Sequence, residues 1–137
     1  MHFDSSAFIA EQELIDALAK RSASVSCAED RVLFKQGESP AGLYILRKGR
    51  AVLSMQSATG VQVMSVTAFP GSLLGLPALV GNEPYTLTAT ALKGAALGYV
   101  AREDFASLML TEPNIAMRVL RVLAAEVRTA RHAISEF

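Results

Sequence analysis

Between Arg31 and Ala101, apolar and polar residues alternate along the chain, and a glycine or proline interrupts the alternation at short intervals. A period of two is typical of a strand that buries one face. Turns spaced about 8–12 residues apart are typical of an all-β barrel or sandwich. The sequence therefore predicts a β-barrel over residues 31–101, in which the turn S-A-T-G at 57–60 joins two strands as a hairpin. The alternating runs are 32-VLFKQGE-38, 41-AGLYILRKG-49, 50-RAVLSMQSATG-60, 61-VQVMSVTAF-69, 86-TLTATALKG-94 and 95-AALGYVA-101.

On both sides of this region the period becomes helical. Residues 5–20 predict an N-terminal helix, and the small polar residues after it indicate a connector. Residues 102–111 predict a short helix. A long helix is expected over 112–135, with Thr111 as its N-cap and Pro113 in its first turn, where a missing N–H does no harm.

The long helix carries two sets of apolar residues. One set recurs at the 4, 3, 4, 3, 4 spacing of a heptad seam, and a second set gives the helix another apolar flank. Two apolar flanks need two surfaces to bury them, so we expect the seam to pair with the same helix of a second copy in a homodimer. The alternative is a helix that packs only on its own barrel. The seam is Ala116, Leu120, Leu123, Val127, Ala130 and Ile134, and the second flank is Met117, Val119, Val122 and Ala124.

Composition restricts the class of protein. A chain of 137 residues is long enough for one domain, 1–137, to bury a core without disulfides or metals. Its 13 basic and 13 acidic side chains cancel, whereas nucleic-acid-binding domains usually carry a basic excess. No secretion signal or long apolar run is present. We therefore expect a cytoplasmic protein that does not bind nucleic acid through this segment and does not bind a membrane.

Catalytic and metal sites are not expected either. The single cysteine, Cys27, excludes an intramolecular disulfide, and the two histidines lie far apart without nearby partners for a metal. The sequence offers no nucleophile with a plausible base, no paired acidic motif and no glycine-rich loop followed by lysine. An enzyme is therefore not expected.

A glycine-punctuated segment, 71-GSLLGLPALVGNEPYTLTATAL-92, precedes the last strands. Together with 37-GESPAGLYILRKGRAVL-53 and 112-EPNIAMRVLRVLAAEVR-128, it resembles the cyclic-nucleotide-binding domain of the catabolite-activator and fumarate-nitrate-regulator superfamily. The resemblance covers about residues 8–137. It implies a mainly β fold with flanking helices: a double-stranded β-helix, or jelly-roll, barrel with a long C-terminal dimerisation helix. No bound cofactor is implied beyond a cyclic nucleotide or another small effector.

In that family the segment 71–86 is a phosphate-binding cassette, in which backbone N–H groups at a helix N-terminus face the cyclic phosphate. The resemblance places Ser72 where the family has a ribose-binding glutamate, and Tyr85 where it has the phosphate-pairing arginine. Ser72 has an alternative role as the cap of the cassette helix, and Tyr85 as a filler of the ligand space. The ligand-binding candidates are Gly71, Ser72, Leu73, Tyr85, Thr86 and, on the long helix, Arg131.

Without the arginine and the glutamate, the usual pose of cyclic AMP loses several kcal/mol, about a hundredfold or more in affinity. Two functions then remain. One is a sensor for a small effector in another pose, which signals through the dimerisation helix. The other is a ligand-free dimerisation or protein-interaction module, in which Tyr85 and the leucines of 73–80 fill the barrel. An open polar cavity beside Ser72, Tyr85 and Thr86 favours the sensor, and a packed one favours the ligand-free module.

Overall fold

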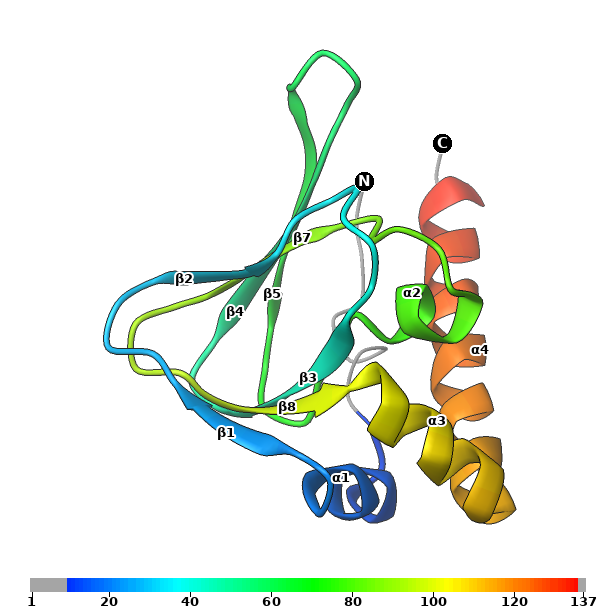
Figure 1. Cartoon of the computed structure of the whole chain (residues 1–137). Coiled ribbons are helices and arrows are strands. Elements are labelled where there is room, and N and C mark those ends of the chain that lie inside the picture. Colours follow the sequence, from blue (N-terminus) through cyan, green and yellow to red (C-terminus); the bar gives the residue numbers. More distant parts are fainter. Residues whose placement is uncertain (1–9, 136–137) are drawn as a thin grey trace.

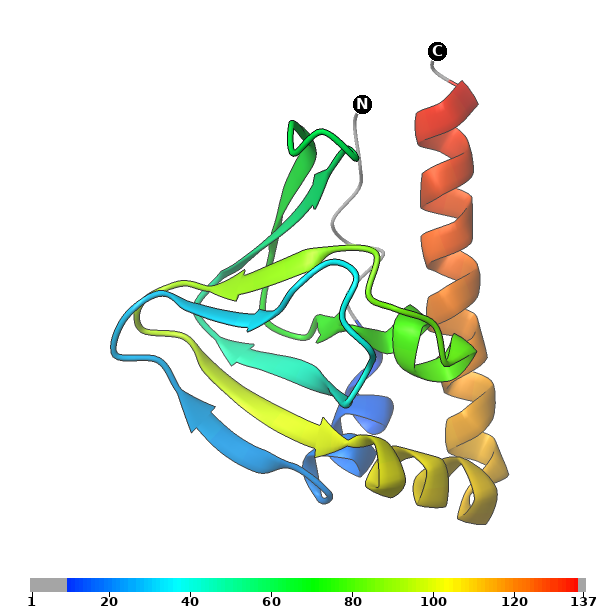
Figure 2. The same ribbon diagram turned by 45° about the horizontal axis from the view of Figure 1, so that its top comes forward.

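Two antiparallel four-stranded sheets form the barrel, and the helices lie along one side of it (Figures 1 and 2). The computed structural model describes the backbone of residues 10–135 and the side chains of residues 10–126. One sheet consists of β1 (Ala23–Ser26), β8 (Ala96–Ala101), β3 (Gly42–Lys48) and β6 (Leu73–Leu74), in that order. The other consists of β2 (Arg31–Phe34), β7 (Thr88–Ala91), β4 (Ala51–Gln56) and β5 (Gln62–Ala68), in that order. This strand order is that of a jelly roll, which confirms the predicted fold class.

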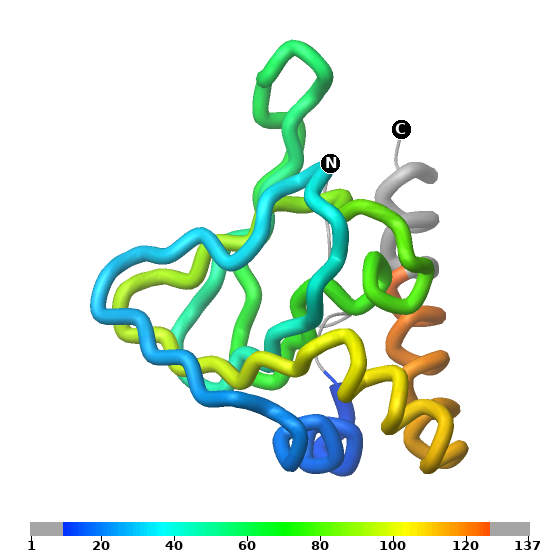
Figure 3. The backbone as a smooth tube through the Cα atoms, viewed as in Figure 1, coloured from blue at the N-terminus to red at the C-terminus, as the bar shows by residue number. Residues whose placement is uncertain are grey.

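The alternation along β3 creates two cores. Leu43 and Ile45 are fully buried on the side that the helices cover, whereas Leu46 is fully buried inside the barrel. Successive side chains of a strand point to opposite faces, so β3 separates an outer core shared with the helices from an inner core between the sheets. The β4–β5 hairpin contributes Ala51, Leu53 and Ala68 to the inner core, while its end, with the predicted turn at 57–60, extends away from both cores (Figure 3).

Four helices complete the described chain: α1 (Gln12–Ala19), α2 (Leu76–Gly81), α3 (Arg102–Thr111) and α4 (Pro113–Ser135). Helix α2 lies between β6 and α4 in both ribbon views (Figures 1 and 2). Ile115, Val119 and Val122 of α4 are buried in the outer core, where α4 also meets α1 and α3. The C-terminal helix therefore packs against the domain through one apolar stripe.

The element boundaries differ from the sequence prediction in three places. Helix α1 begins at Gln12, after two described residues that are not helical, and residues 5–9 of the predicted helix lie outside the described chain. The predicted connector contains β1, because residues 23–26 pair with β8 over four positions. Thr111 ends α3 and donates its hydroxyl to the carbonyl of Ser107 at 2.8 Å. It is therefore not the N-cap of α4.

Candidate functional site

The cassette is built as β6, a left-handed glycine and the six-residue helix α2. Gly75 is the N-cap of α2 with a φ of 92°, and Pro77 lies in the first turn, where no N–H is needed. Gly71, with a φ of 98°, donates its N–H to the carbonyl of Leu46 at 2.8 Å. The Gly71 N–H group is therefore already hydrogen-bonded to β3.

Ser72 is fully buried, and its hydroxyl donates to the carbonyl oxygen of Phe69 at 2.6 Å. The hydroxyl thus closes its own turn. It does not cap α2, whose N-cap is Gly75 and has no side-chain cap bond, so that alternative for Ser72 is wrong. Ser72 is also not among the residues that line the cavity beside Tyr85.

Tyr85 occupies the middle of the cassette site. Its side chain is 5% exposed, its ring stacks on Phe34 with centroids 3.9 Å apart, and its hydroxyl donates to the carbonyl of Gly42 at 2.7 Å. Its backbone N–H donates to Glu38, and its carbonyl accepts from Gly37. Hydrogen bonds of both the side chain and the backbone therefore fix the position of the Tyr85 ring.

The cavity that remains beside this ring measures about 50 Å³. Small-molecule pockets are typically about 300–1,000 Å³, so the space next to Tyr85 is packed. The closeness of the packing shows at Gly75, where a Cβ atom would lie 2.9 Å from Tyr85 Cε1 and 3.3 Å from Phe34 Cε2. Only glycine allows the cassette backbone to approach the two rings so closely.

The other predicted ligand residues are placed as follows. Leu73 is buried, pairs with Ile45 in the sheet and contributes to the cavity wall. Thr86 is exposed and lines the same cavity. The side chain of Arg131 lies outside the described residues. The structure therefore brings Leu73, Tyr85 and Thr86 together at one cavity, and it places Gly71 and Ser72 in the turn that leads into β6.

One polar residue of this cavity was missed by sequence reasoning. Glu126 of α4 lines it together with Pro77, Ala78 and Thr86. Its Oε1 atom is buried and has no hydrogen-bond partner among the described residues. Burial raises the pKa of the Glu126 carboxyl from 4.5 to about 7, because a low-polarity surrounding disfavours the charged form.

A signal for Glu126 does exist in the sequence. The buried stripe of α4 runs Ile115, Val119, Val122 at spacings of four and three, and the next position of that stripe is 126. A carboxyl group at a position where an apolar residue is expected is a departure from the helical pattern. The heptad spacing of the neighbouring flank is the more regular pattern in the same helix.

The predicted dimer seam lies on the flank of α4 next to the buried stripe, because each seam residue follows a stripe residue by one position. Leu120 is 55% exposed, and Ala116 is half-buried. Leu123 is half-buried and packs partly against the outer core. Beside the seam, a largely apolar groove of about 400 Å³ is lined by Leu79, Val80, Phe105, Met109 and Leu120, among others. The side chains of Val127, Ala130 and Ile134 lie outside the described residues.

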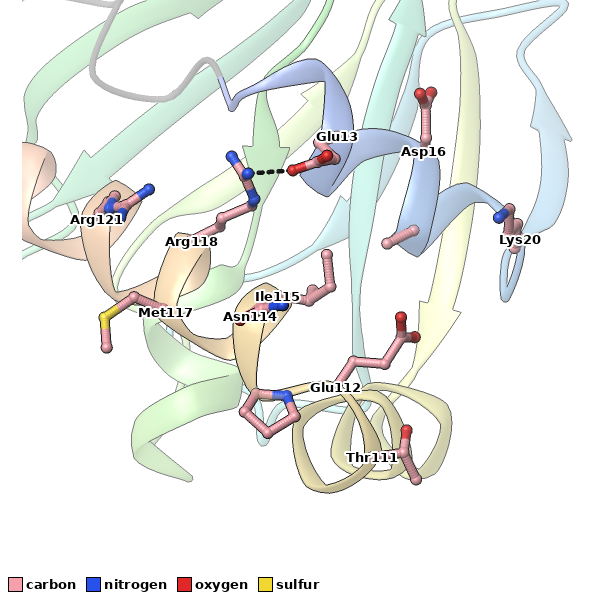
Figure 4. A pocket seen from close by; sticks show the side chains of 12 residues that line it. Glu13, Asp16, Lys20, Thr111, Glu112, Asn114, Ile115, Met117, Arg118 and Arg121 are labelled. Carbon is pink, nitrogen blue, oxygen red and sulfur yellow. Dashed lines mark ion pairs between the residues drawn. The ribbon is translucent and has the colours of Figure 1, made fainter.

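A wider groove, of about 790 Å³, lies between α1 and the start of α4 (Figure 4). Two arginines of α4 that line it form ion pairs with acidic residues at the start of α1. Arg118 forms ion pairs with Glu11 and Glu13, and Arg121 lies 3.9 Å from Glu11. Since the Arg118 side chain is engaged by carboxylates of Glu11 and Glu13, these ion pairs join α1 to α4 along the groove.

Within residues 10–126, no cluster of three or more histidine, cysteine, aspartate or glutamate side chains could hold a metal ion. None of the described helices combines the length and the apolar character needed to cross a bilayer.

Comparison with known proteins agrees with the predicted resemblance. The sequence profile described as cyclic nucleotide-binding domain matches residues 24–112. A CRP-like cAMP-activated global transcriptional regulator of Mycobacterium tuberculosis is 24% identical over 126 residues, which are 92% of this chain and 56% of the relative. The HTH-type transcriptional regulator Cmr of the same species is 30% identical over 117 residues, 85% of this chain and 48% of the relative. The chain spans about half the length of the curated relatives it matches.

Among solved structures, the catabolite activator protein of Thermus thermophilus superimposes with a TM-score of 0.80 at 22% identity. The match covers 91% of this chain and 59% of that chain. It confirms the predicted fold.

Proposed function

This chain belongs to the cyclic nucleotide-binding domain family, and we propose that it is a regulatory sensor domain of the catabolite-activator and FNR type. In this proposal a small effector acts at the cavity beside the cassette, and the response passes to α4, through which two copies associate. Its curated relatives are transcriptional regulators, and we extend that role to the protein that contains this domain. DNA contact is not assigned to this segment, whose 13 basic and 13 acidic residues cancel.

One observation carries the proposal: α4 supplies part of the wall of the cassette cavity. Glu126 of α4 lines it together with Pro77 and Ala78 of α2 and with Thr86. A group that enters the cavity, or a shift of the cassette, therefore changes the surroundings of α4 directly. An effector alters an equilibrium only through contacts that differ between two states, and this wall is a place where such a difference arises.

The effector we propose is not a cyclic nucleotide in the usual pose. Tyr85 stands at the position that the resemblance gives to the phosphate-pairing arginine, and it is stacked on Phe34. The described residues that line the remaining cavity include no lysine or arginine. An anionic phosphate would meet the Glu126 carboxyl instead of a basic partner.

The dimer is supported by the division of α4 into two flanks. Val119 and Val122 are buried against the domain, while Leu120 and Met117 are more than half exposed. Exposed apolar residues grouped on one helix are typical of an interaction surface. We propose that the seam pairs with the same seam of a second copy.

A ligand-free dimerisation module is the second candidate, and the Phe34–Tyr85 stack favours it. With the aromatic rings in place, the cavity measures about 50 Å³, which meets the packed condition stated for that function. The two candidates differ in one measurable property. A sensor couples the barrel site to dimerisation, whereas a scaffold dimerises independently of that site.

Sedimentation equilibrium of the wild type and two variants tests this coupling. Tyr85→Ala empties the site, and Leu97→Ala removes a buried barrel side chain that does not line the cavity. Allosteric coupling is typically about 5–150-fold in affinity. We expect the dimer dissociation constant to change at least about fivefold in Tyr85→Ala and to stay within twofold of the wild type in Leu97→Ala. Equal constants in all three proteins would favour the scaffold, and a monomer at every concentration would overturn the dimer.

A further inference from the structure

The cavity between the cassette and α4 is lined mostly by apolar residues, among them Pro77, Ala78 and Leu87. Three described lining residues, Tyr85, Thr86 and Glu126, have polar side chains. Buried polar atoms in folded proteins nearly always have a hydrogen-bond partner. Glu126 Oε1 is buried and has none among the described residues. The site therefore contains an acceptor for which the described chain supplies no donor.

The position of Glu126 on α4 places its carboxyl at the cavity and not on the exposed side of the helix. Glu126 continues the stripe of Ile115, Val119 and Val122 that faces the domain. An ordinary solvent-facing glutamate would lie on the other flank, beside Leu120. Because the buried stripe holds it toward α2, the carboxyl meets any group that enters the cavity.

Resting on the proposed sensor function, we propose that Glu126 is the polar anchor of the effector site, and that the effector presents a cationic, N–H-donating group such as an amine or an amidine. Such a group donates to Oε1 and pairs with the ionised carboxyl. An anionic group would face the same carboxyl without a basic partner among the lining residues. The chemistry of the site is therefore the reverse of that expected for a phosphate cassette.

Among the described residues, no other charged side chain lines the cavity with Glu126. Helix α2, with the sequence LPALVG, has no titratable side chain. Of the other described lining residues only Tyr85 is titratable, and its hydroxyl is bonded to Gly42. On α4, Arg118 and Arg121 pair with acidic groups of Glu11 and Glu13 near α1. Glu83, in the segment that follows α2, is exposed and does not line the cavity.

A pair of small ions of the same shape and opposite charge tests the proposal. Acetamidinium carries N–H donors and a positive charge, whereas acetate carries neither. Each is titrated into the whole chain at constant ionic strength, and amide chemical shifts of Ala78, Thr86 and Glu126 are followed by NMR. The titrations are repeated for Glu126→Gln, a neutral variant of nearly the same shape, and at pH 6 and pH 8.

We expect acetamidinium to give a saturable shift with a dissociation constant of about 1–10 mM at pH 8, as suits a probe of four heavy atoms. Because the carboxyl titrates at about 7, its ionised fraction rises about tenfold between pH 6 and pH 8, and the affinity should rise with it. Acetate should bind at least tenfold more weakly, and Glu126→Gln should lose the acetamidinium response. Equal binding of the two ions, no binding of acetamidinium, or an unchanged response in Glu126→Gln would overturn the proposal. None of these outcomes bears on the coupling of Tyr85 to dimerisation, which tests the sensor function separately.

Discussion

The hydroxyl of Tyr85 donates a hydrogen bond to the carbonyl oxygen of Gly42 at 2.7 Å and thereby holds the Tyr85 ring against Phe34. The bond joins the cassette to the first residue of β3. Beside the ring it leaves a cavity of about 50 Å³, which Glu126 of α4 also lines.

Two substitutions separate the hydrogen bond of Tyr85 from the volume of its ring. Tyr85→Phe removes one neutral hydrogen bond and should lower the free energy of unfolding by about 1 kcal/mol. Tyr85→Ala also empties a buried aromatic site, and should lower it by about 3–5 kcal/mol. Urea denaturation measures both, with Tyr44→Phe as the control, because the Tyr44 hydroxyl has no hydrogen bond among the described residues. Equal losses in Tyr85→Phe and Tyr85→Ala would show that the ring does not fill the site.

Gly75→Ala tests how closely the cassette approaches the rings. The φ of Gly75 is 92°, and a Cβ there would lie 2.9 Å from Tyr85. Gly94 has nearly the same φ, 90°, but has open space around its Cβ position, so Gly94→Ala measures the backbone strain alone, about 1–2 kcal/mol. Gly75→Ala should destabilise the fold by at least about 1 kcal/mol more, because it overpacks the stack. Thermal denaturation with equal losses for the two variants would contradict the contact.

Glu126 gives stability a distinctive dependence on pH. Its pKa rises from 4.5 to about 7 in the fold, so the folded state binds the proton more tightly than the unfolded state does. The penalty for ionising it is absent below pH 4.5, grows as pH rises towards 7 and is constant above. Wild type should therefore lose on the order of 3 kcal/mol, relative to Glu126→Gln, between pH 4.5 and pH 8.

Denaturation of both proteins at several pH values measures this difference. Groups that the two proteins share contribute equally and cancel in the comparison. A difference that does not change with pH would mean that the carboxyl is not held in a low-polarity site.

Leu120→Asp tests the seam of α4. Leu120 is 55% exposed on the seam flank of α4, so a charge there should be tolerated by the monomer and should weaken a helix pair by at least about tenfold. Leu110→Asp is the matched control, since Leu110 of α3 is 84% exposed and does not belong to the seam. Analytical ultracentrifugation should show weakened association for Leu120→Asp alone. Equal association of both variants with the wild type would place any dimer contact elsewhere.

Most of the fold was predictable because its signals are local. The alternation of 31–101 predicted strands, and the sequence REDFASLMLT predicted α3 with its observed bounds, Arg102–Thr111. The strand β1 was not predictable from its own residues, because the small polar side chains of 23–26 are ordered by pairing with β8. Propensity is weaker than such tertiary pairing.

The candidate site was predictable in outline but not in its chemistry. The resemblance located the cassette. Because Tyr85 stands where the family has an arginine, its ring was expected as one possible filler of the ligand space. The buried hydroxyl of Ser72, bonded to Phe69, could not be read from spacing, because a turn bond and a helix cap use the same kind of side chain. Glu126 was missed because the heptad seam and the buried stripe share one helix, and only the packing shows which flank faces the domain.

Calorimetric titration of the whole chain with cyclic AMP and cyclic GMP tests most directly whether Tyr85 and Phe34 close the nucleotide site. With the rings stacked 3.9 Å apart and about 50 Å³ beside them, we expect no saturable heat up to about 1 mM nucleotide and no shift in thermal stability. Saturable binding in the micromolar range would contradict the closed site. It would be accompanied by a stabilisation of about 2.7 kcal/mol at 100 times the dissociation constant.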